Sequence, residues 1–148
     1  MTTFAKILQR AYHERPNQTA LTLLTTGQPD TPITTAQLLQ GAAGYAKTLH
    51  QQGVQPGEIV ILILQHSPDL IYAYFGCILY GAIPSIMPFL TEKLLPERYR
   101  SDLAALVSVT QPSTIITYPD FEPEVHAALQ SGSSRSEEHT SELQSPNT

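Results

Sequence analysis

The chain of 148 residues is long enough for about one ordinary domain. It carries 8 Lys and Arg against 13 Asp and Glu, a net charge of −5, and it has no basic run that would bind a nucleic-acid backbone. Its single cysteine, Cys77, excludes a disulfide framework and a cysteine-based metal site, and this usage is typical of the reducing cytoplasm. We therefore expect a cytoplasmic protein that does not bind nucleic acid.

The segment 131–148 differs in composition from the rest of the chain. Its only large apolar residue is Leu143, so the segment buries too little surface to offset its ordering entropy, and we expect it to be disordered. Residues 135–145, RSEEHTSELQS, resemble one translated frame of a common sequencing adapter, which makes the tail a predicted artefact. An authentic disordered tail is the alternative. Without its one Arg and three Glu, the chain keeps seven basic and ten acidic residues.

Residues 1–52 predict two helices and a strand. Phe4, Ile7 and Leu8 recur at helical spacing, which predicts a docking helix that ends before Pro16; a transit peptide is the alternative. Residues 19–24 favour a strand, and the Gly- and Pro-rich residues 25–32 predict a turn. The next helix begins at a capping box, T-x-x-Q at residues 34–37, and ends at Gly53.

The second half of the sequence predicts alternating strands and helices. Six consecutive apolar residues at 59–64 indicate a strand buried on both faces, as in a parallel sheet covered by helices. A helix over residues 70–80, capped by Ser67, a short extended segment at 82–88, a helix over 96–109, a strand at 113–118 and one more helix from 120 follow. This order predicts βαβ units and a three-layer α/β fold with mostly parallel, buried strands.

The apolar stretch 61–89 also raises two functional alternatives. A membrane span is disfavoured because Pro84 and Pro88 break its last third, which leaves only the length of a buried core helix. A phosphate site at the start of the helix is disfavoured because the turn has no glycine, Pro68 removes a donor and Asp69 already supplies negative charge. We therefore expect this turn to be capped for stability.

Sequence motifs that carry chemistry are missing. The sequence contains no G-x-G-x-x-G, no Walker loop with its Lys, no G-x-S-x-G and no H-E-x-x-H. Among the dispersed histidines only His66 merits attention, since it lies in the turn after the buried strand, and a surface or capping role is the expectation. We therefore assign no catalytic, cofactor-binding or metal-binding residue.

Taken in order, several weak motifs resemble the start of an adenylate-forming enzyme, the superfamily of AMP-dependent acyl-CoA synthetases, peptide-synthetase adenylation domains and luciferases. QPGEIVILIL stands where that family has Gly-Val-x-x-Gly-Asp-x-Val, and HSPDLIYAYFGCILYGAIPSIMP is similar to its Asn-Ser-x-Glu, helix, Gly-Ala and short strand. The resemblance covers residues 4–129. Glu58, His66 and Asp69 replace the usual Asp, Asn and Glu, and the segment 89–109 leaves the subfamily open.

The resemblance implies ATP- and Mg²⁺-dependent activation of a small-molecule carboxylate, such as a fatty acid, to an acyl-adenylate. Thioester formation with CoA or a carrier phosphopantetheine usually follows. The family's phosphate loop and catalytic Lys do not occur in this sequence, so no site residue is carried over. We interpret residues 1–130 as a partial N-terminal subdomain of an AMP-binding domain, inactive by itself, followed by the tail 131–148. The alternatives are a small non-enzymatic α/β interaction module and a small nucleotide-binding domain.

Overall fold

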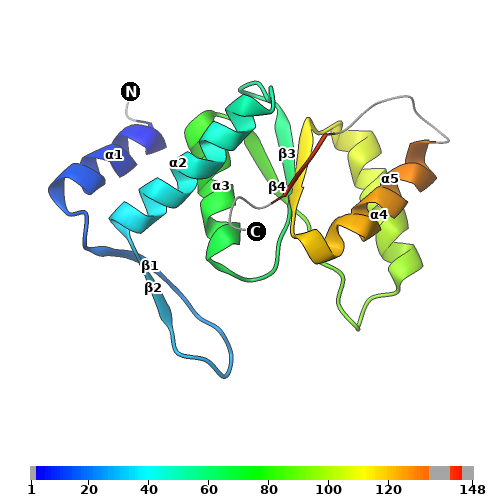
Figure 1. Cartoon of the computed structure of the whole chain (residues 1–148), viewed down its shortest axis with the longest axis horizontal. Coiled ribbons are helices and arrows are strands. Elements are labelled where there is room, and N and C mark those ends of the chain that lie inside the picture. Colours follow the sequence, from blue (N-terminus) through cyan, green and yellow to red (C-terminus); the bar gives the residue numbers. More distant parts are fainter. Residues whose placement is uncertain (1–2, 134–140, 145–148) are drawn as a thin grey trace.

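The structure is a computed structural model that describes residues 3–133 and 141–144 (Figure 1). Its α-helices are α1 Phe4–Glu14, α2 Thr35–Gln51, α3 Pro68–Tyr80, α4 Pro96–Thr110 and α5 Glu122–Ser133. Its strands are β1 Thr19–Leu23, β2 Thr31–Thr34, β3 Ile59–Ile63, β4 Ile83–Ile86, β5 Thr114–Thr117 and β6 Ser141–Gln144; a 3₁₀ turn, η1 Pro119–Phe121, precedes α5. From β3 to α5 strands and helices alternate, as in βαβ units.

The larger sheet has the strand order β4-β3-β5-β6, and every neighbouring pair is parallel. Ile59 lies opposite Ile83 on one side of β3, and Val60 lies opposite Thr114 on the other side. The chain therefore leaves β3 in one direction to form β4, and α4 carries it back across to β5. These parallel connections confirm the predicted α/β fold class.

Strand β3 is buried on both faces because helices cover both sides of the sheet. Val60 and Leu62 belong to a core cluster with residues of α2 and α3, whereas Ile61 and Ile63 pack with residues of α4 and α5. Figure 1 shows these two helix pairs on opposite sides of the strands. The apolarity of β3 thus comes from a three-layer core, as predicted, and no helix of the described residues is long and apolar enough to cross a membrane.

The predicted start and end of α2 are confirmed. The Thr34 side chain accepts from the Gln37 N–H while the Gln37 side chain accepts from the Thr34 N–H, which completes the capping box that starts α2. Gly53, with φ of +81°, lets the Val54 N–H donate to the Leu49 carbonyl at 3.1 Å after the end of α2. The N-terminal helix α1 docks as expected, and its Phe4 ring stacks on Phe75 of α3 with centroids 5.2 Å apart.

Strand β2 begins within the segment predicted to be a turn. It pairs antiparallel with β1, and Ile33 lies opposite Leu21 in a separate two-stranded sheet. Ile33 is 1% exposed and packs with Leu8 and Leu38. Burial of this side chain favours an extended backbone at the end of the Pro-rich segment. Tertiary packing here overrides local propensity.

The structure also differs from the expected disorder of the tail 131–148. Residues 131–133 continue α5, and Ser141–Gln144 form β6, parallel to β5 with Thr114 opposite Ser141. An open strand edge presents a row of free N–H and C=O groups, and an extended segment can pair with it whatever its side chains. The rest of the tail lies outside the described residues. Its origin from an adapter stays a prediction.

Candidate functional site at the carboxyl edge of the sheet

The carboxyl ends of β3, β4 and β5 form the edge at which open α/β sheets bind ligands, especially where the strand order reverses. In this sheet the reversal lies between β3 and β5, because β4 and β5 follow in sequence but flank β3 on opposite sides. The segments at this edge are residues 64–67 after β3, 87–95 after β4 and Tyr118 after β5.

The turn after β3 is closed by internal hydrogen bonds. His66 Nε2 lies 2.8 Å from the Leu24 carbonyl oxygen and so ties the turn to the β1–β2 hairpin, in agreement with the expected surface role. Ser67 occupies the N-cap position of α3, but its hydroxyl donates to the Gln65 carbonyl at 3.0 Å instead of capping the helix. Pro68 stands at the first helical position, where it removes a donor that an anion would need.

The helix start next to this turn carries negative charge. The Tyr45 hydroxyl of α2 donates to Asp69 Oδ1 at 3.3 Å, so the carboxylate stays at the positive end of α3 and is shared with a neighbouring helix. An incoming phosphate would meet this carboxylate and no glycine loop. The arrangement agrees with a turn built for stability.

Tyr118, directly after β5, lies at the point where the strand order reverses. Its ring stacks on Phe121 with centroids 5.4 Å apart. Burial raises the pKa of Tyr118, a hydrogen bond with the Gln65 side chain opposes this shift, and the Asp120 carboxylate adds to it. The hydrogen bond between Gln65 and Tyr118 joins the segments that follow β3 and β5, so these two side chains span the point where the strand order reverses.

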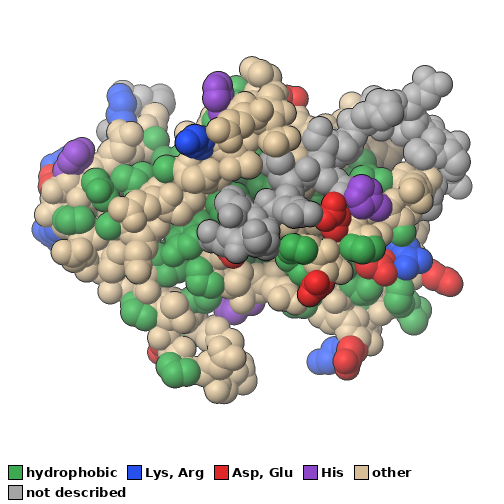
Figure 2. Space-filling model, viewed as in Figure 1, with side chains coloured by type: hydrophobic (Ala, Val, Ile, Leu, Met, Phe, Trp, Pro, Cys, Tyr) green, Lys and Arg blue, Asp and Glu red, His purple; other side chains and the backbone are tan. Residues whose placement is uncertain are grey.

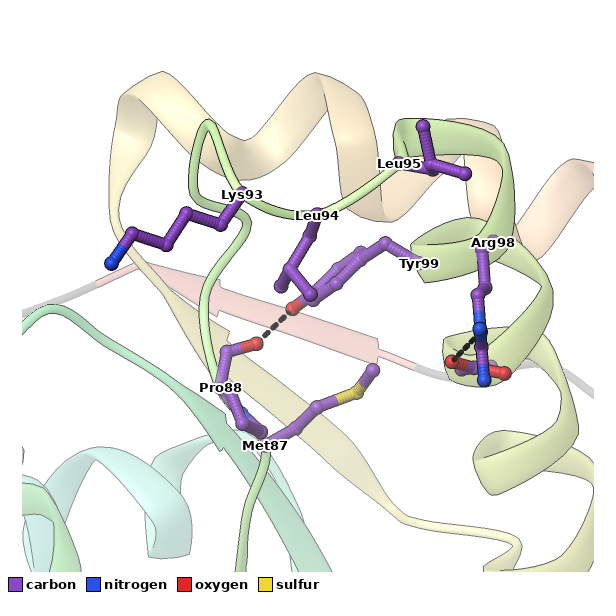
Figure 3. A pocket seen from close by; sticks show the side chains of 8 residues that line it. Met87, Pro88, Lys93, Leu94, Leu95, Arg98 and Tyr99 are labelled. Atoms are coloured by element: carbon purple, nitrogen blue, oxygen red, sulfur yellow. Dashed lines mark hydrogen bonds and ion pairs between the residues drawn. The ribbon is translucent and has the colours of Figure 1, made fainter.

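A cavity of about 440 Å³ opens after β4 (Figure 3). It is lined by the segment that leaves β4 and by the first turns of α4: Met87, Pro88, Lys93, Leu94, Leu95, Arg98, Tyr99 and Asp102. The Tyr99 hydroxyl donates to the Pro88 carbonyl oxygen and so fixes this segment against α4. Burial raises the pKa of Tyr99, with Tyr118 and Glu124 adding to the effect. The phenol therefore stays neutral and acts as a hydrogen-bond donor.

The rim of the cavity carries both charges. Arg98 Nε lies 4.0 Å from Asp102 Oδ2, whereas Lys93 extends away from the other labelled side chains in Figure 3. The lining is partly apolar, with Met87 buried and Leu94 exposed. The size and lining suit a small ligand with an apolar body. None of the lining residues is a nucleophile paired with a base, so the cavity can hold a ligand but shows no pair of catalytic side chains.

Other polar and reactive side chains have structural roles. Arg100 binds Glu124 of α5 through two hydrogen bonds, of 2.7 and 3.0 Å, so this side chain makes a helix–helix contact. On the face seen in Figure 2, blue and red side chains alternate over α4 and α5 without a continuous basic stripe. Cys77 is buried in the core beside α2, and burial raises its pKa to about 12, as expected of an unreactive thiol.

Binding of ATP and Mg²⁺ requires donors for phosphate oxygens and ligands for a metal ion. Across residues 3–133 and 141–144 no group of three or more His, Cys, Asp and Glu side chains is placed to hold a metal ion. The helix start that follows the central strand combines Pro68 with Asp69, which is unfavourable for a triphosphate. The described residues therefore show neither a cluster of metal-binding side chains nor a helix start open to phosphate oxygens.

Comparison with known proteins identifies the family. The sequence profile described as AMP-binding enzyme matches residues 8–147. The chain belongs to this family of adenylate-forming enzymes. It is 33% identical over 85 residues to the p-hydroxybenzoic acid–AMP ligase FadD22 of Mycobacterium tuberculosis, an alignment that covers 57% of this chain and 11% of that protein.

Solved structures of the family share the fold. The fatty acid AMP ligase of Legionella pneumophila is 28% identical, with a TM-score of 0.64 over 80% of this chain and 20% of that one. The McyG A-PCP structure, in complex with phenylalanyl-adenylate, gives a TM-score of 0.77 over 99% of this chain and 22% of that one, at 18% identity, and so shows the fold alone. The chain spans between a tenth and a quarter of the length of these relatives.

Two features of the site were not predicted from the sequence. The cavity after β4 depends on how residues 87–95 fold against α4, and the Gln65–Tyr118 contact depends on β3 and β5 being neighbours. The unusual segment FLTEKLLPERYR, residues 89–100, was the available signal, since it supplies most of the cavity lining.

Proposed function

We propose that residues 1–130 are a structural part of a ligase that activates a carboxylic acid with ATP. In the proposed reaction a carboxylate oxygen bonds to the α-phosphorus of ATP and pyrophosphate leaves, which yields an acyl-adenylate. Usually the thiol of CoA or of a carrier pantetheine then attacks the acyl carbon, which forms a thioester and releases AMP. The observation that carries this proposal is the family match over residues 8–147.

The substrate is proposed to be a fatty or aromatic acid. This rests on two relatives, 33% and 28% identical, whose names specify p-hydroxybenzoic acid and a fatty acid. The single cysteine favours the cytoplasm as the compartment.

We further propose that the 148-residue chain does not catalyse adenylation alone. The described residues supply no donor set for a triphosphate or Mg²⁺, and the cavity after β4 contains no reacting group. Residues 1–130 instead contribute the parallel sheet and the helices that cover it, which would hold other parts of the enzyme in place.

A graft tests the proposal. Residues 1–130 replace the matching segment of the Legionella fatty acid AMP ligase, and ATP–pyrophosphate exchange is measured with a fatty acid. We expect exchange by the graft, and none by the isolated chain or by the ligase without the segment. A Gly76→Val graft serves as a control, because a larger side chain at that position collides with Tyr45 and should abolish the rescue.

Two outcomes would contradict the proposal. Exchange by the isolated chain would overturn its predicted inactivity. A folded graft no more active than the deleted ligase would favour the alternative of a non-enzymatic α/β interaction module.

A further inference from the structure

Strand β4 forms one end of the larger sheet, and its outer edge faces away from β3. Ile83 and Ile86 on this strand are 50% and 53% exposed. An exposed apolar edge strand is a template for pairing with another chain, and proteins usually protect such edges. The backbone of β4 shows how this one is protected.

Hydrogen bonds to β3 establish which way each β4 residue faces. The Ile83 N–H donates to the Glu58 carbonyl at 2.8 Å, and the Met87 N–H donates to the Leu62 carbonyl at 3.0 Å. Backbone groups of successive residues in a strand point to opposite sides. The odd-numbered positions from 83 to 87 therefore face β3, and positions 84, 86 and 88 face outward.

Two of these three outward positions are prolines. Pro84 lies within β4 and Pro88 lies two residues beyond its end; neither has an N–H, so Ile86 presents the one backbone donor among the outward positions from 84 to 88. Proline in a sheet is tolerated where its missing N–H would have faced solvent, and positions 84 and 88 both face that way. A ladder along this edge would lack two of its three donors.

The other end of the sheet is different. The Ser113 N–H donates to the Ile59 carbonyl at 2.9 Å, so Thr114 and Ile116 direct their backbone groups away from β3. Both residues have an N–H, and β6 pairs with β5 over four consecutive residues. The β5 edge therefore accepts a parallel strand.

We propose that this sheet extends in one direction only: the outer edge of β4 is closed to strand pairing by Pro84 and Pro88, and further strands join at β5. The closed edge itself needs only the contacts described here, so its test involves no adenylation.

The test restores the missing donors in the full chain. A Pro84→Thr/Pro88→Thr variant supplies two outward N–H groups without adding apolar surface. Sedimentation velocity over a concentration series should show self-association strengthened on the order of tenfold or more relative to the parent, since each net hydrogen bond contributes severalfold. Hydrogen exchange should show new protection of the amides at positions 84, 86 and 88. A Pro96→Thr/Pro119→Thr variant, changed at two exposed helix-start prolines, is the matched control and should behave like the parent.

Two results would overturn the proposal. One is a double variant with native circular dichroism that associates no more than the control. The other is a parent chain whose own self-association already protects the Ile86 amide, since that edge would then be open despite its prolines. If the double variant does not fold, the single Pro88→Thr variant, changed just beyond the end of β4, decides by the same two measurements, with a smaller increase expected.

Discussion

Gly76 of α3 lies so close to Tyr45 of α2 that a β-carbon added to the glycine would be 2.6 Å from the Tyr45 Cβ and 2.8 Å from the Ala42 carbonyl oxygen. Neither contact can be relieved by rotating a flexible side chain, because one atom is a β-carbon and the other is backbone. The two helices that cover one face of β3 therefore depend on this glycine for their spacing.

Gly76→Ala is expected to lower the free energy of unfolding by about 1–3 kcal/mol, the usual cost of overpacking a core. Gly44→Ala, on the exposed side of α2 with nothing within 4 Å of the added carbon, is the matched control. It should raise stability by about 0.5–1 kcal/mol through helix propensity. Urea unfolding of dilute protein measures both. Equal effects of the two substitutions would contradict the close packing of α2 and α3.

Two threonines of β5 differ in how their buried hydroxyls are satisfied. Thr114 Oγ1 has no hydrogen-bond partner among the described residues, whereas Thr117 Oγ1 donates to the Ile63 carbonyl at 3.0 Å. Thr114→Val is expected to stabilise the chain by about 1 kcal/mol, and Thr117→Val to destabilise it by about the same amount. The pair is compared by the shift of the urea midpoint. Destabilisation by Thr114→Val would show that its hydroxyl has a partner.

The contact between Arg100 and Glu124 predicts a pH dependence. Hydrogen bonds from Arg100 lower the pKa of Glu124, which opposes the smaller effect of burial. A carboxyl group whose pKa is lower in the folded state stabilises above its unfolded pKa, and this stability is lost as the pH falls through the folded value. Glu124→Gln should therefore cost about 0.5–1 kcal/mol at pH 7, given that both partners are partly exposed, and the difference should begin to shrink as the pH falls below about 4.3, the usual pKa of Glu.

Unfolding free energies of parent and Glu124→Gln from pH 3 to pH 8 check this prediction. Glu14→Gln, which disrupts the fully exposed pair with Arg10 within α1, is the control and should leave the profile unchanged. A constant difference between parent and Glu124→Gln at all pH values would show that packing, and not charge, accounts for the effect.

The thiol of Cys77 should be unreactive in the folded chain. With a pKa of about 12 and a buried position in α3, it is thiolate in only about one molecule in ten thousand at pH 8. We expect a disulfide reagent to label it about a thousandfold more slowly in buffer than in denaturant. Cys77→Ser/Ser108→Cys, which moves the thiol to the exposed face of α4, should react rapidly in both. Fast labelling of native Cys77 would contradict the packing around α3.

Sequence patterns predicted those parts of the fold that are set by neighbouring residues. The apolar run at 59–64 and the Thr34–Gln37 capping box gave a central strand and a helix start that the structure confirms. Strand β2 could not be predicted from neighbouring residues, because it depends on the burial of Ile33 against helices elsewhere in the chain. The Arg100–Glu124 and Gln65–Tyr118 contacts and the cavity beside Tyr99 likewise join residues whose proximity follows from the order of the strands.

The order of the strands has a consequence during synthesis. Strand β3, the most apolar of the strands, ends at Ile63, and its partner β5 is complete only at Thr117, 54 residues later. At about 5–20 residues per second, a ribosome needs about 3–11 s to make that interval. For those seconds one edge of β3 has no partner from its own chain, and we expect the nascent polypeptide to be most dependent on chaperones at that stage.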